Sequence, residues 1–465
     1  MNQGNLSRRG FLARTLGGLA AAGLPLWYAK ELTLDAQEKA GAGRGVAPSD
    51  RIVMAAIGTG TNRTRRTAAQ PLHGERGFAI MRDAIGRPGV QMVAVCDVDR
   101  PNAEFAARSV GMDCRIFADY RELLRTMTGV EAVTIGTPDH WHAAVAIAAM
   151  RAGKDVYCEK PLTLTIQEGK EMVRVARETG RVLQTGSQQR SDARFRLACE
   201  LVRNKRIGDV RRVTTLIGDN PVGGPFTSEP APEGLNWDFW QGPTPRVDYV
   251  KQRCHYDFRW WYEYSGGKMT DWGAHHNDIA QWGLGMDGSG PVAVRGTGTA
   301  PSTDRNSYNC HPQFTATYTY ANGPRGRDGT TLICRSNTPE GWAHPNNGIL
   351  FEGDEGKWIF VNRGSISAND RRIIDEPLPA GAERLEVSTN HMQNFVDCVR
   401  SRRAPICNVN VGHRSVTVCH IGNIAIRTGH SLHWDPRGER FTGEHADEAN
   451  AMLQRPRRDP YTLPG

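Results

Sequence analysis

Short apolar runs that alternate with helical segments constrain the fold of this chain most strongly. Residues 52–57 (IVMAAI) form such a run, and Gly58 and Gly60 follow directly. Further apolar runs lie within residues 90–100, 130–143, 154–165 and 181–190. Uninterrupted apolar runs are typical of strands that are covered on both faces. We therefore predict an α/β fold with a doubly wound parallel sheet, whose ligand lies at the carboxyl ends of the strands.

The residues at these strand ends predict a dinucleotide site. The G-x-G of Gly58 and Gly60 lets the backbone turn tightly and bring amide groups to a pyrophosphate. Arg63 stands where the third glycine of G-x-G-x-x-G is expected, so ordinary turn glycines explain this motif equally well. Asp97 ends the second run, where a carboxylate accepts hydrogen bonds from a ribose and repels a 2′-phosphate, which favours NAD over NADP. Its interval from Gly60 exceeds the usual ~20 residues, which indicates an inserted loop.

The N-terminus is similar to a twin-arginine export signal. Arg8 and Arg9 precede Phe11, Leu12 and a Gly/Ala-rich run that continues to Ala29. Arg14 and the glycines make a membrane span a weaker alternative. The small residues at 40–42 offer a cleavage site. We expect residues 1–48 to be a signal and linker outside the fold, and the protein to be periplasmic, with the twin-arginine machinery as a partner. This route carries folded proteins, so a soluble cofactor would have to travel tightly bound.

Length, charge and cysteine content limit the number of domains and the kinds of partner and metal site that we expect. A chain of 465 residues favours two domains over one. The net charge is +8, but Lys and Arg are scattered, so we expect no nucleic-acid partner. The ten cysteines form no C-x-x-C pair, which argues against a zinc motif, while disulfide pairing stays open.

The second half of the chain predicts a large sheet. Alternating patterns at 210–219, 291–300, 314–320, 330–337 and 356–362 indicate half-exposed strands. Residues 391–405 and 412–429 are expected to be helices. We assign residues 49–186 to the dinucleotide domain, 187–430 to a substrate and oligomerisation domain, and 431–465 to a C-terminal tail.

Six motifs in order resemble the glucose-fructose oxidoreductase/inositol dehydrogenase (Gfo/Idh/MocA) family. They are GTG, CDVD, TPDHWHA, EKPL, GSQQR and GGKMTDWGAHHND. The resemblance covers residues 51 to about 430. TPDHWHA and WGAHHND resemble an exported twin-arginine subgroup. The resemblance implies an N-terminal Rossmann domain and a C-terminal α/β domain with a large open-faced, mostly antiparallel sheet. It also implies a homo-oligomer that assembles through this sheet.

The resemblance implies that Lys160 lies beside the nicotinamide and that Asp271 and His275 act on the substrate. Hydride removal from a sugar C–OH also requires loss of the hydroxyl proton, and a histidine is suited to accept it. Asp271 lies four residues before His275 and can orient the imidazole or hold a second sugar hydroxyl. Asp278 is a further candidate to orient His275. The residues that we expect to bind the cofactor are Gly58, Gly60, Arg63, Asp97, Thr137, Pro138, His142, Glu159 and Lys160.

The aromatic stretch 255–264 (HYDFRWWYEY) fits either a sugar-binding face or apolar support beneath the active site. We predict substrate contacts from Arg259, Tyr264, His276 and Gln188. The spacing of His275 and Asp278 would suit a metal, but a third ligand is not evident, so we predict none.

The leading hypothesis is an NAD-dependent oxidoreductase that acts on a sugar or sugar derivative, with NADP as the less favoured cofactor. Two alternatives stay open. One is a redox-neutral, NAD-dependent glycoside hydrolase or lyase that works through a 3-keto intermediate. The other is a non-catalytic periplasmic sugar-binding protein, against which an intact Lys160 and His275 argue.

Overall fold

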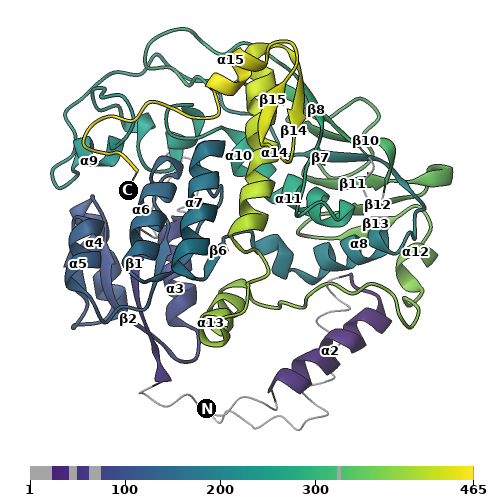
Figure 1. The fold of residues 1–465 in the computed structure, drawn as a ribbon, viewed down its shortest axis with the longest axis horizontal. Coiled ribbons are helices and arrows are strands. Elements are labelled where there is room, and N and C mark those ends of the chain that lie inside the picture. Colours follow the sequence, from purple (N-terminus) through teal and green to yellow (C-terminus); the bar gives the residue numbers. More distant parts are fainter. Residues whose placement is uncertain (1–22, 41–49, 62–74, 322–325, 464–465) are drawn as a thin grey trace.

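A parallel six-stranded sheet forms the N-terminal domain (Figure 1). The computed structural model describes residues 23–40, 50–61, 75–321 and 326–463. The strand order is β3-β2-β1-β4-β5-β6, which confirms the predicted doubly wound fold. The strands are β1 (Ile52–Ile57), β2 (Val90–Cys96), β3 (Arg115–Phe117), β4 (Ala132–Ile135), β5 (Asp155–Cys158) and β6 (Leu183–Thr185).

Helices pack on both faces of this sheet because its strands are apolar on both sides. All four residues of β4 and of β5 are buried. The helices are α3 (Arg76–Ile85), α4 (Arg100–Val110), α5 (Tyr120–Thr126), α6 (Asp139–Arg151) and α7 (Ile166–Thr179). The start of α7 is fixed by a capping box between Thr165 and Glu168, and its end by Gly180 in the left-handed region.

A nine-stranded sheet forms the C-terminal domain, in the order β13-β12-β11-β7-β10-β9-β8-β14-β15. Only β7 and β10 pair in parallel, so the sheet is mostly antiparallel as predicted. Along β9 buried and half-exposed residues alternate, since one face is packed and the other open. The strands are β7 (Val210–Leu216), β8 (Ala293–Gly298), β9 (Phe314–Tyr320), β10 (Gly326–Arg335), β11 (Gly348–Glu352), β12 (Trp358–Val361), β13 (Ile366–Ala368), β14 (Ser431–Asp435) and β15 (Arg440–Thr442).

Helix α14 (Val409–Thr428) joins the two domains. It packs against α7 of the Rossmann domain and against β8 and β9 of the second sheet. Helix α11 (Gly273–Leu284) contacts α14, α8 and β7, which places the predicted histidine segment at the centre of the molecule. The other helices are α2 (Leu26–Ala40), α8 (Ala193–Arg203), α9 (Trp237–Gln241), α10 (Lys268–Asp271), α12 (Arg372–Asp375), α13 (His391–Ser401) and α15 (Ala446–Ala451).

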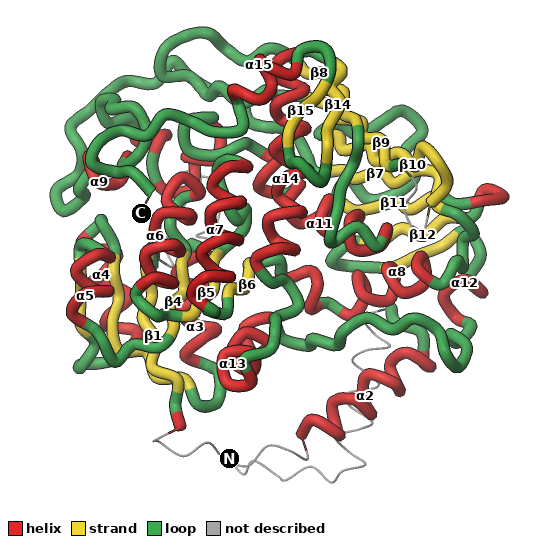
Figure 2. The backbone as a smooth tube through the Cα atoms, viewed as in Figure 1, coloured by secondary structure: helices red, strands yellow, loops and turns green. Residues whose placement is uncertain are grey.

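The segment between β7 and α10 consists mainly of loops and short helical turns, η3 (Lys251–Arg253) and η4 (His255–Trp260) among them. Figure 2 shows these loops in green around α9, beside the helices of the Rossmann domain. This long segment of the C-terminal domain therefore lies beside the dinucleotide domain.

Both chain ends differ from the prediction. Tyr28 in α2 is fully buried against the C-terminal domain, so the expectation that all of residues 1–48 stay outside the fold is wrong for this helix. In the predicted tail, β14 pairs with β8 and extends the sheet. Trp434 and Phe441 are buried there, which is why this segment packs against the C-terminal domain. No helix in the described part of the chain is long and apolar enough to cross a membrane.

Candidate active site

One cleft between the two domains collects most of the predicted site residues. Its lining includes Gly58, Gly60, Asp97, Thr137, Pro138, His142, Glu159, Lys160, Gln188, Arg259, Asp271 and His275. Lys160 follows β5 of the Rossmann domain, whereas His275 lies in α11 of the other domain. Arg63 falls outside the described residues, so its predicted role stays a prediction.

Three glycines form a cradle beneath the cleft. Gly58 has φ +72°, and a Cβ there would lie 2.5 Å from the backbone N of Thr137. A Cβ on Gly77 would lie 1.9 Å from the Gly58 carbonyl oxygen, and one on Gly136 would lie 2.4 Å from the Gly77 Cα. Gly77 thus supplies the close helix–strand packing of a third fingerprint glycine. An insertion separates Gly77 from Gly60 in the sequence, so the G-x-G-x-x-G spacing does not point to it.

Asp97 closes the cradle at the end of β2. Its Oδ2 accepts hydrogen bonds from the Gly60 amide at 2.9 Å and the Thr59 hydroxyl at 3.3 Å. Its Oδ1 accepts from the Asp99 amide at 3.0 Å. Burial raises the pKa of Asp97 to about 6, although these amide bonds oppose the shift. The carboxylate therefore orders the glycine loop and lies where a ribose would bind.

These features fit a dinucleotide. The β1 turn and the start of α3 present backbone to the cleft at the place where a pyrophosphate binds in this fold. Among the described residues, Thr137 Oγ1 and Glu75 Oε1 are buried in the cleft wall without a hydrogen-bond partner. Buried polar atoms are normally paired, so these two atoms indicate that a polar ligand belongs here. Gly58, Gly60, Gly77, Asp97 and Thr137 would hold it.

A strap from the C-terminal domain pairs with the residues that follow Asp97 at one end of this cleft. Leu235 forms an antiparallel bridge with Asp99, and the Arg100 amide donates to the Gly234 carbonyl at 3.0 Å. His255 adds a side-chain contact, since its Nε2 lies 3.4 Å from Asp99 Oδ2 and its Nδ1 lies 3.7 Å from Glu75 Oε1. The strap therefore borders the part of the cleft next to Asp97.

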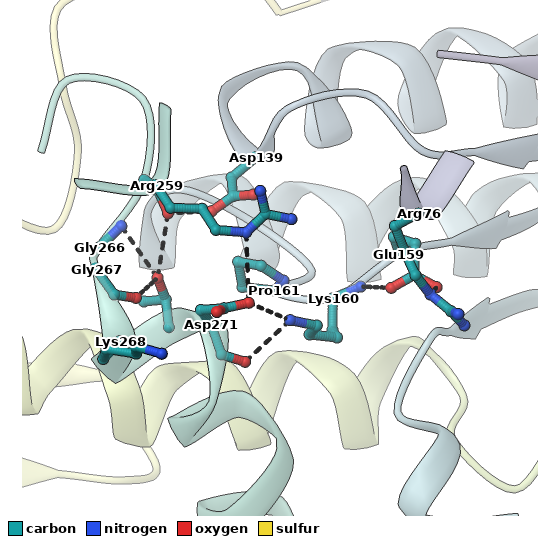
Figure 3. A network of polar contacts seen from close by, with 12 residues as sticks. Arg76, Asp139, Glu159, Lys160, Pro161, Arg259, Gly266, Gly267, Lys268 and Asp271 are labelled. Carbon is teal, nitrogen blue, oxygen red and sulfur yellow. Dashed lines mark hydrogen bonds and ion pairs between the residues drawn. The ribbon is translucent and has the colours of Figure 1, made fainter. Parts of the chain in front are cut away.

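Lys160 and Asp271 connect the domains inside the cleft (Figure 3). Lys160 Nζ donates to Asp271 Oδ1 at 2.6 Å and to the Asp271 carbonyl oxygen at 3.0 Å. Arg259 Nε lies 3.5 Å from the same carboxylate oxygen. Burial alone would raise the pKa of Asp271, but Lys160 and Arg259 outweigh it and hold that pKa well below its usual range. Asp271 is therefore a fixed anion that positions two cations.

His275 offers a neutral imidazole to the same cleft. Its side chain is 6% exposed, and its Nδ1 has no hydrogen-bond partner among the described residues. Burial first, and then the positive charges of Lys160 and Arg363, lower the pKa of His275 well below its usual value. The ring is thus unprotonated at neutral pH and free to accept a proton. Asp271 bonds to Lys160 and Arg259 rather than orienting this ring.

Glu159 is held by its own set of partners. Its Oε1 accepts from Arg76 Nε at 2.8 Å and from Gln188 Nε2 at 2.8 Å. Its Oε2 accepts from the Lys160 backbone amide at 3.2 Å. Glu159 therefore fixes the backbone that carries Lys160 (Figure 3), and Gln188 reaches the cleft as a partner of Glu159.

His142 ties two motifs together. Its Nδ1 lies 2.7 Å from the Pro161 carbonyl oxygen and its Nε2 lies 2.8 Å from the Thr137 carbonyl oxygen. Both contacts are donor bonds only when both ring nitrogens carry protons. The side chain thereby clamps the TPDHWHA segment to the residue after Lys160, which is a positioning role.

Three candidates lie behind the cleft wall. Tyr264 is 1% exposed, packs on His140 and Trp240, and does not line the cleft. His276 is fully buried, and its Nε2 contacts Asn347 Oδ1 at 2.9 Å, which makes it part of the scaffold. Asp278 pairs with the buried Arg190 at 2.8 Å and so does not orient His275.

Arg363 also lines the cleft, although no sequence motif predicts it. It follows β12 and its guanidinium lies 4.6 Å from the centroid of the Trp272 ring. Partial burial and the neighbouring Arg76 lower the pKa of Arg363. Arg363 is far from the other site residues in the sequence and comes close to them only in the folded chain.

Metal-type side chains do not gather in the cleft of the described structure. The group with suitable ligand atoms consists of His430, His445 and Glu448, whose ligand atoms lie within 4.8 Å of one another. None of the three lines the cleft, and Glu448 and His445 are exposed.

Fold and cleft define a two-domain Rossmann protein in which a dinucleotide site faces side chains from a second α/β domain. Two family profiles match this chain. "Oxidoreductase family, NAD-binding Rossmann fold" covers residues 52–187, and "Oxidoreductase family, C-terminal alpha/beta domain" covers residues 224–463. The chain therefore belongs to the Gfo/Idh/MocA oxidoreductase family, as its motifs indicated.

Individual relatives match over part of their length. Inositol 2-dehydrogenase of Rhizobium meliloti (strain 1021) is 27% identical over 212 residues, which cover 46% of this chain and 52% of that protein. The scyllo-inositol 2-dehydrogenase (NAD(+)) of Bacillus subtilis (strain 168) is 30% identical over 200 residues, or 43% of this chain and 48% of that protein. The chain thus spans about half the length of the curated relatives that it matches.

The fold is similar to solved structures over most of the chain. The aldose-aldose oxidoreductase from Caulobacter crescentus, complexed with glycerol, gives a TM-score of 0.58 at 19% identity. The match covers 82% of this chain and 99% of that one. At this identity the likeness establishes the shared architecture.

Proposed function

We propose that this protein is an NAD-dependent oxidoreductase that transfers a hydride between a sugar C–OH group and a tightly held nicotinamide dinucleotide. One observation carries the proposal. Lys160 of the dinucleotide domain and His275 of the other domain line the same cleft as the Gly58, Gly77 and Gly136 cradle. The partial matches to inositol dehydrogenases support a polyhydroxylated substrate.

Oxidation of an alcohol requires the departure of a hydride from carbon and a proton from oxygen. The nicotinamide ring supplies the hydride acceptor when the cofactor is bound. Neutral His275, with its free Nδ1, is the base that takes the hydroxyl proton. Lys160 donates a hydrogen bond to the same oxygen and stabilises negative charge that develops on it. Asp271 keeps the Lys160 ammonium in place from across the domain boundary.

Asp97 supports NAD over NADP. A carboxylate at this position accepts hydrogen bonds from ribose hydroxyls and repels a 2′-phosphate. The strap at Gly234, Leu235 and His255 supports tight retention, because the cofactor could leave only after these interdomain contacts open.

We also propose that the protein is exported by the twin-arginine route, on the strength of Arg8, Arg9 and the run that follows. A bound cofactor that must be reset outside the cytoplasm fits an enzyme that oxidises one sugar and reduces another. The open face of the nine-stranded sheet, with Arg212, Thr317, Thr319 and Trp358 on a shallow groove, supports a homo-oligomer.

One assay tests the proposed reaction. The purified protein is denatured, and the supernatant is assayed for released NAD and NADP. The intact protein is then incubated with inositols, aldoses and glycosides. We expect stoichiometric NAD, and an oxidised sugar (keto-sugar or lactone) together with an equal amount of protein-bound NADH or of a second sugar reduced to its alcohol. Cleavage of a glycoside without net oxidation would point to the redox-neutral reaction, and sugar binding without any turnover would point to a binding protein.

A further inference from the structure

Helix α2 lies in a part of the chain that the export signal would be expected to discard. Figure 1 shows it in purple along the edge of the C-terminal domain. Leu24, Tyr28 and Leu32 recur every four residues, and all three are 5% exposed or less. They belong to the same hydrophobic cluster as β7, β9 and α8. Leu26 and Leu34 face outward, at 58% and 60% exposed. One side of the helix, together with Leu24 just before it, is therefore buried on the C-terminal domain, while the opposite side is exposed.

Polar contacts make this docking specific. The Tyr28 hydroxyl accepts a hydrogen bond from Arg196 Nε of α8 at 2.6 Å, with both side chains buried. The Arg196 guanidinium also lies 4.9 Å from the Tyr28 ring centroid. Burial raises the pKa of Tyr28, which keeps the hydroxyl neutral. Loss of Tyr28 would expose an apolar groove and leave a buried guanidinium with one partner fewer.

Two further contacts tie α2 to the segment around α12. Trp27 Nε1 donates to the Ile374 carbonyl oxygen at 2.9 Å. Arg384 lies 3.3 Å from Glu31, and its other guanidinium nitrogen lies 3.2 Å from Glu200 of α8. Contacts to three separate segments, with matched donors and acceptors, are expected of a permanent part of a fold rather than of a segment removed during maturation.

We propose that α2 is part of the mature enzyme and that the export signal is cut before it, between Ala22 and Gly23. Two sites carry the small-residue pattern that a signal peptidase recognises: Ala20-Ala21-Ala22 and Ala40-Gly41-Ala42. The second begins at Ala40, the last residue of α2, so cutting there removes the whole docked helix. Water adds across the Ala22–Gly23 peptide bond and leaves a carboxylate on Ala22 and an amine on Gly23. The proposed cleavage site depends on the proposed export. The proposal that α2 belongs to the folded protein does not depend on export.

The docking is tested first, without export. Proteins that lack residues 1–22 or residues 1–42 are made in the cytoplasm and compared by thermal unfolding. We expect the shorter protein to melt lower by about 3 °C or more. In the longer protein, Tyr28→Ala and Leu32→Ala should lower the melting temperature. Leu26→Ala and Leu34→Ala, on the outer face of the same helix, are the matched controls and should leave it unchanged. Equal melting of the two truncated proteins, or equal effects on the two faces, overturns the docking.

The cut is tested on the full chain, expressed with a C-terminal tag in a bacterium that has a working twin-arginine system. The periplasmic protein is measured by intact mass. A mass that begins at Gly23 supports the proposal. A mass that begins at Gly43, or an uncut chain, overturns it. If the chain stays in the cytoplasm, the export proposal and this cut both fail, and the melting comparison still decides whether α2 belongs to the fold.

Discussion

Lys160 and Asp271 come from different domains, yet Lys160 Nζ lies 2.6 Å from Asp271 Oδ1. Both side chains are about nine-tenths buried, at 11% and 10% exposed. A pair this well shielded from water depends on the two domains keeping one relative position (Figure 3). The ion pair therefore couples the geometry of the dinucleotide cleft to that of the second domain.

Replacing Lys160 by Ala should remove turnover in a protein that still folds, although loss of the buried pair with Asp271 lowers its stability. Lys160 is the proposed donor that stabilises negative charge on the reacting oxygen, and removing one donor of this kind costs about 10²–10³-fold in rate. The rate of keto-sugar formation and the NAD content are measured on the same sample. Lys357→Ala, on the exposed end of the second sheet, is the control. A Lys160→Ala protein with nearly normal turnover would exclude the proposed role.

Asp271→Asn should destabilise the protein and do so in a pH-dependent way. Lys160 and Arg259 would keep their charges without the shared anion, and breaking a buried pair costs about 3–5 kcal/mol. The pKa of Asp271 is lowered in the fold, so its contribution is complete above the ordinary carboxyl value of about 3.9. It declines as the pH falls from there towards the lower folded value.

Denaturant unfolding of both proteins between pH 7 and pH 3 checks this. The difference in stability should be constant down to about pH 5 and should shrink below about pH 4. A difference that grows on acidification would mean that Asp271 is not a buried anion.

Most of the framework was accessible from the sequence because it depends on local patterns. Apolar runs that end in Gly58, Asp97, Thr137 and Lys160 predicted the parallel strands and the edge where the ligand belongs. The short strands β11 and β13 were missed, since strands of only five and three residues carry little periodic signal.

The sequence predicted many of the residues that line the site, but not which of them form ion pairs with one another. Helical spacing suggested that Asp271 or Asp278 would serve His275. The helix is interrupted at Trp272, between α10 and α11. Asp271 pairs with Lys160 and Asp278 pairs with Arg190, and both cations come from distant segments of the chain. Pairings of that kind depend on tertiary packing, which one sequence does not reveal. Arg363 was missed for the same reason.

Gly77→Ala should impair the cofactor site far more than an ordinary helix substitution. Its new Cβ would lie 1.9 Å from the Gly58 carbonyl oxygen, so α3 would have to move away from β1. We expect loss of most bound NAD, measured by release on denaturation. Gly86→Ala at the end of the same helix is the control, because a Cβ there meets its nearest atom at 3.4 Å. Equal NAD content in the two variants would show that the cradle is wrongly assigned.

Asp97→Ala should weaken NAD retention and reduce discrimination against NADP. The variant removes the acceptor for the Gly60 amide as well as the proposed ribose contact. Cofactor occupancy after purification and binding of NAD and NADP by the apoprotein are the measurements. Asp113→Ala, at an exposed position, is the control. Unchanged occupancy in the Asp97→Ala protein would mean that the ribose lies elsewhere.

Buried neutral histidines should make the fold sensitive to acid. Burial lowers the pKa of His140 and His420 to about 3, and that of His276 and His391 to about 4. Each binds a proton in the unfolded chain below about pH 6.5 but not in the folded protein. Stability is therefore lost as the pH falls from about 6.5 towards these values, by about 1.4 kcal/mol per pH unit for each ring.

His420→Asn isolates one of these rings from the opposing effect of buried carboxyls such as Asp97, whose raised pKa favours the fold on acidification. Between pH 6 and pH 4.5, the free energy of unfolding of the variant should fall less steeply than that of the parent, by about 1.4 kcal/mol per pH unit. The exposed His433→Asn is the control and should keep the parent slope. Parallel curves for His420→Asn and the parent would show that His420 titrates alike in both states, and that its burial does not hold it neutral.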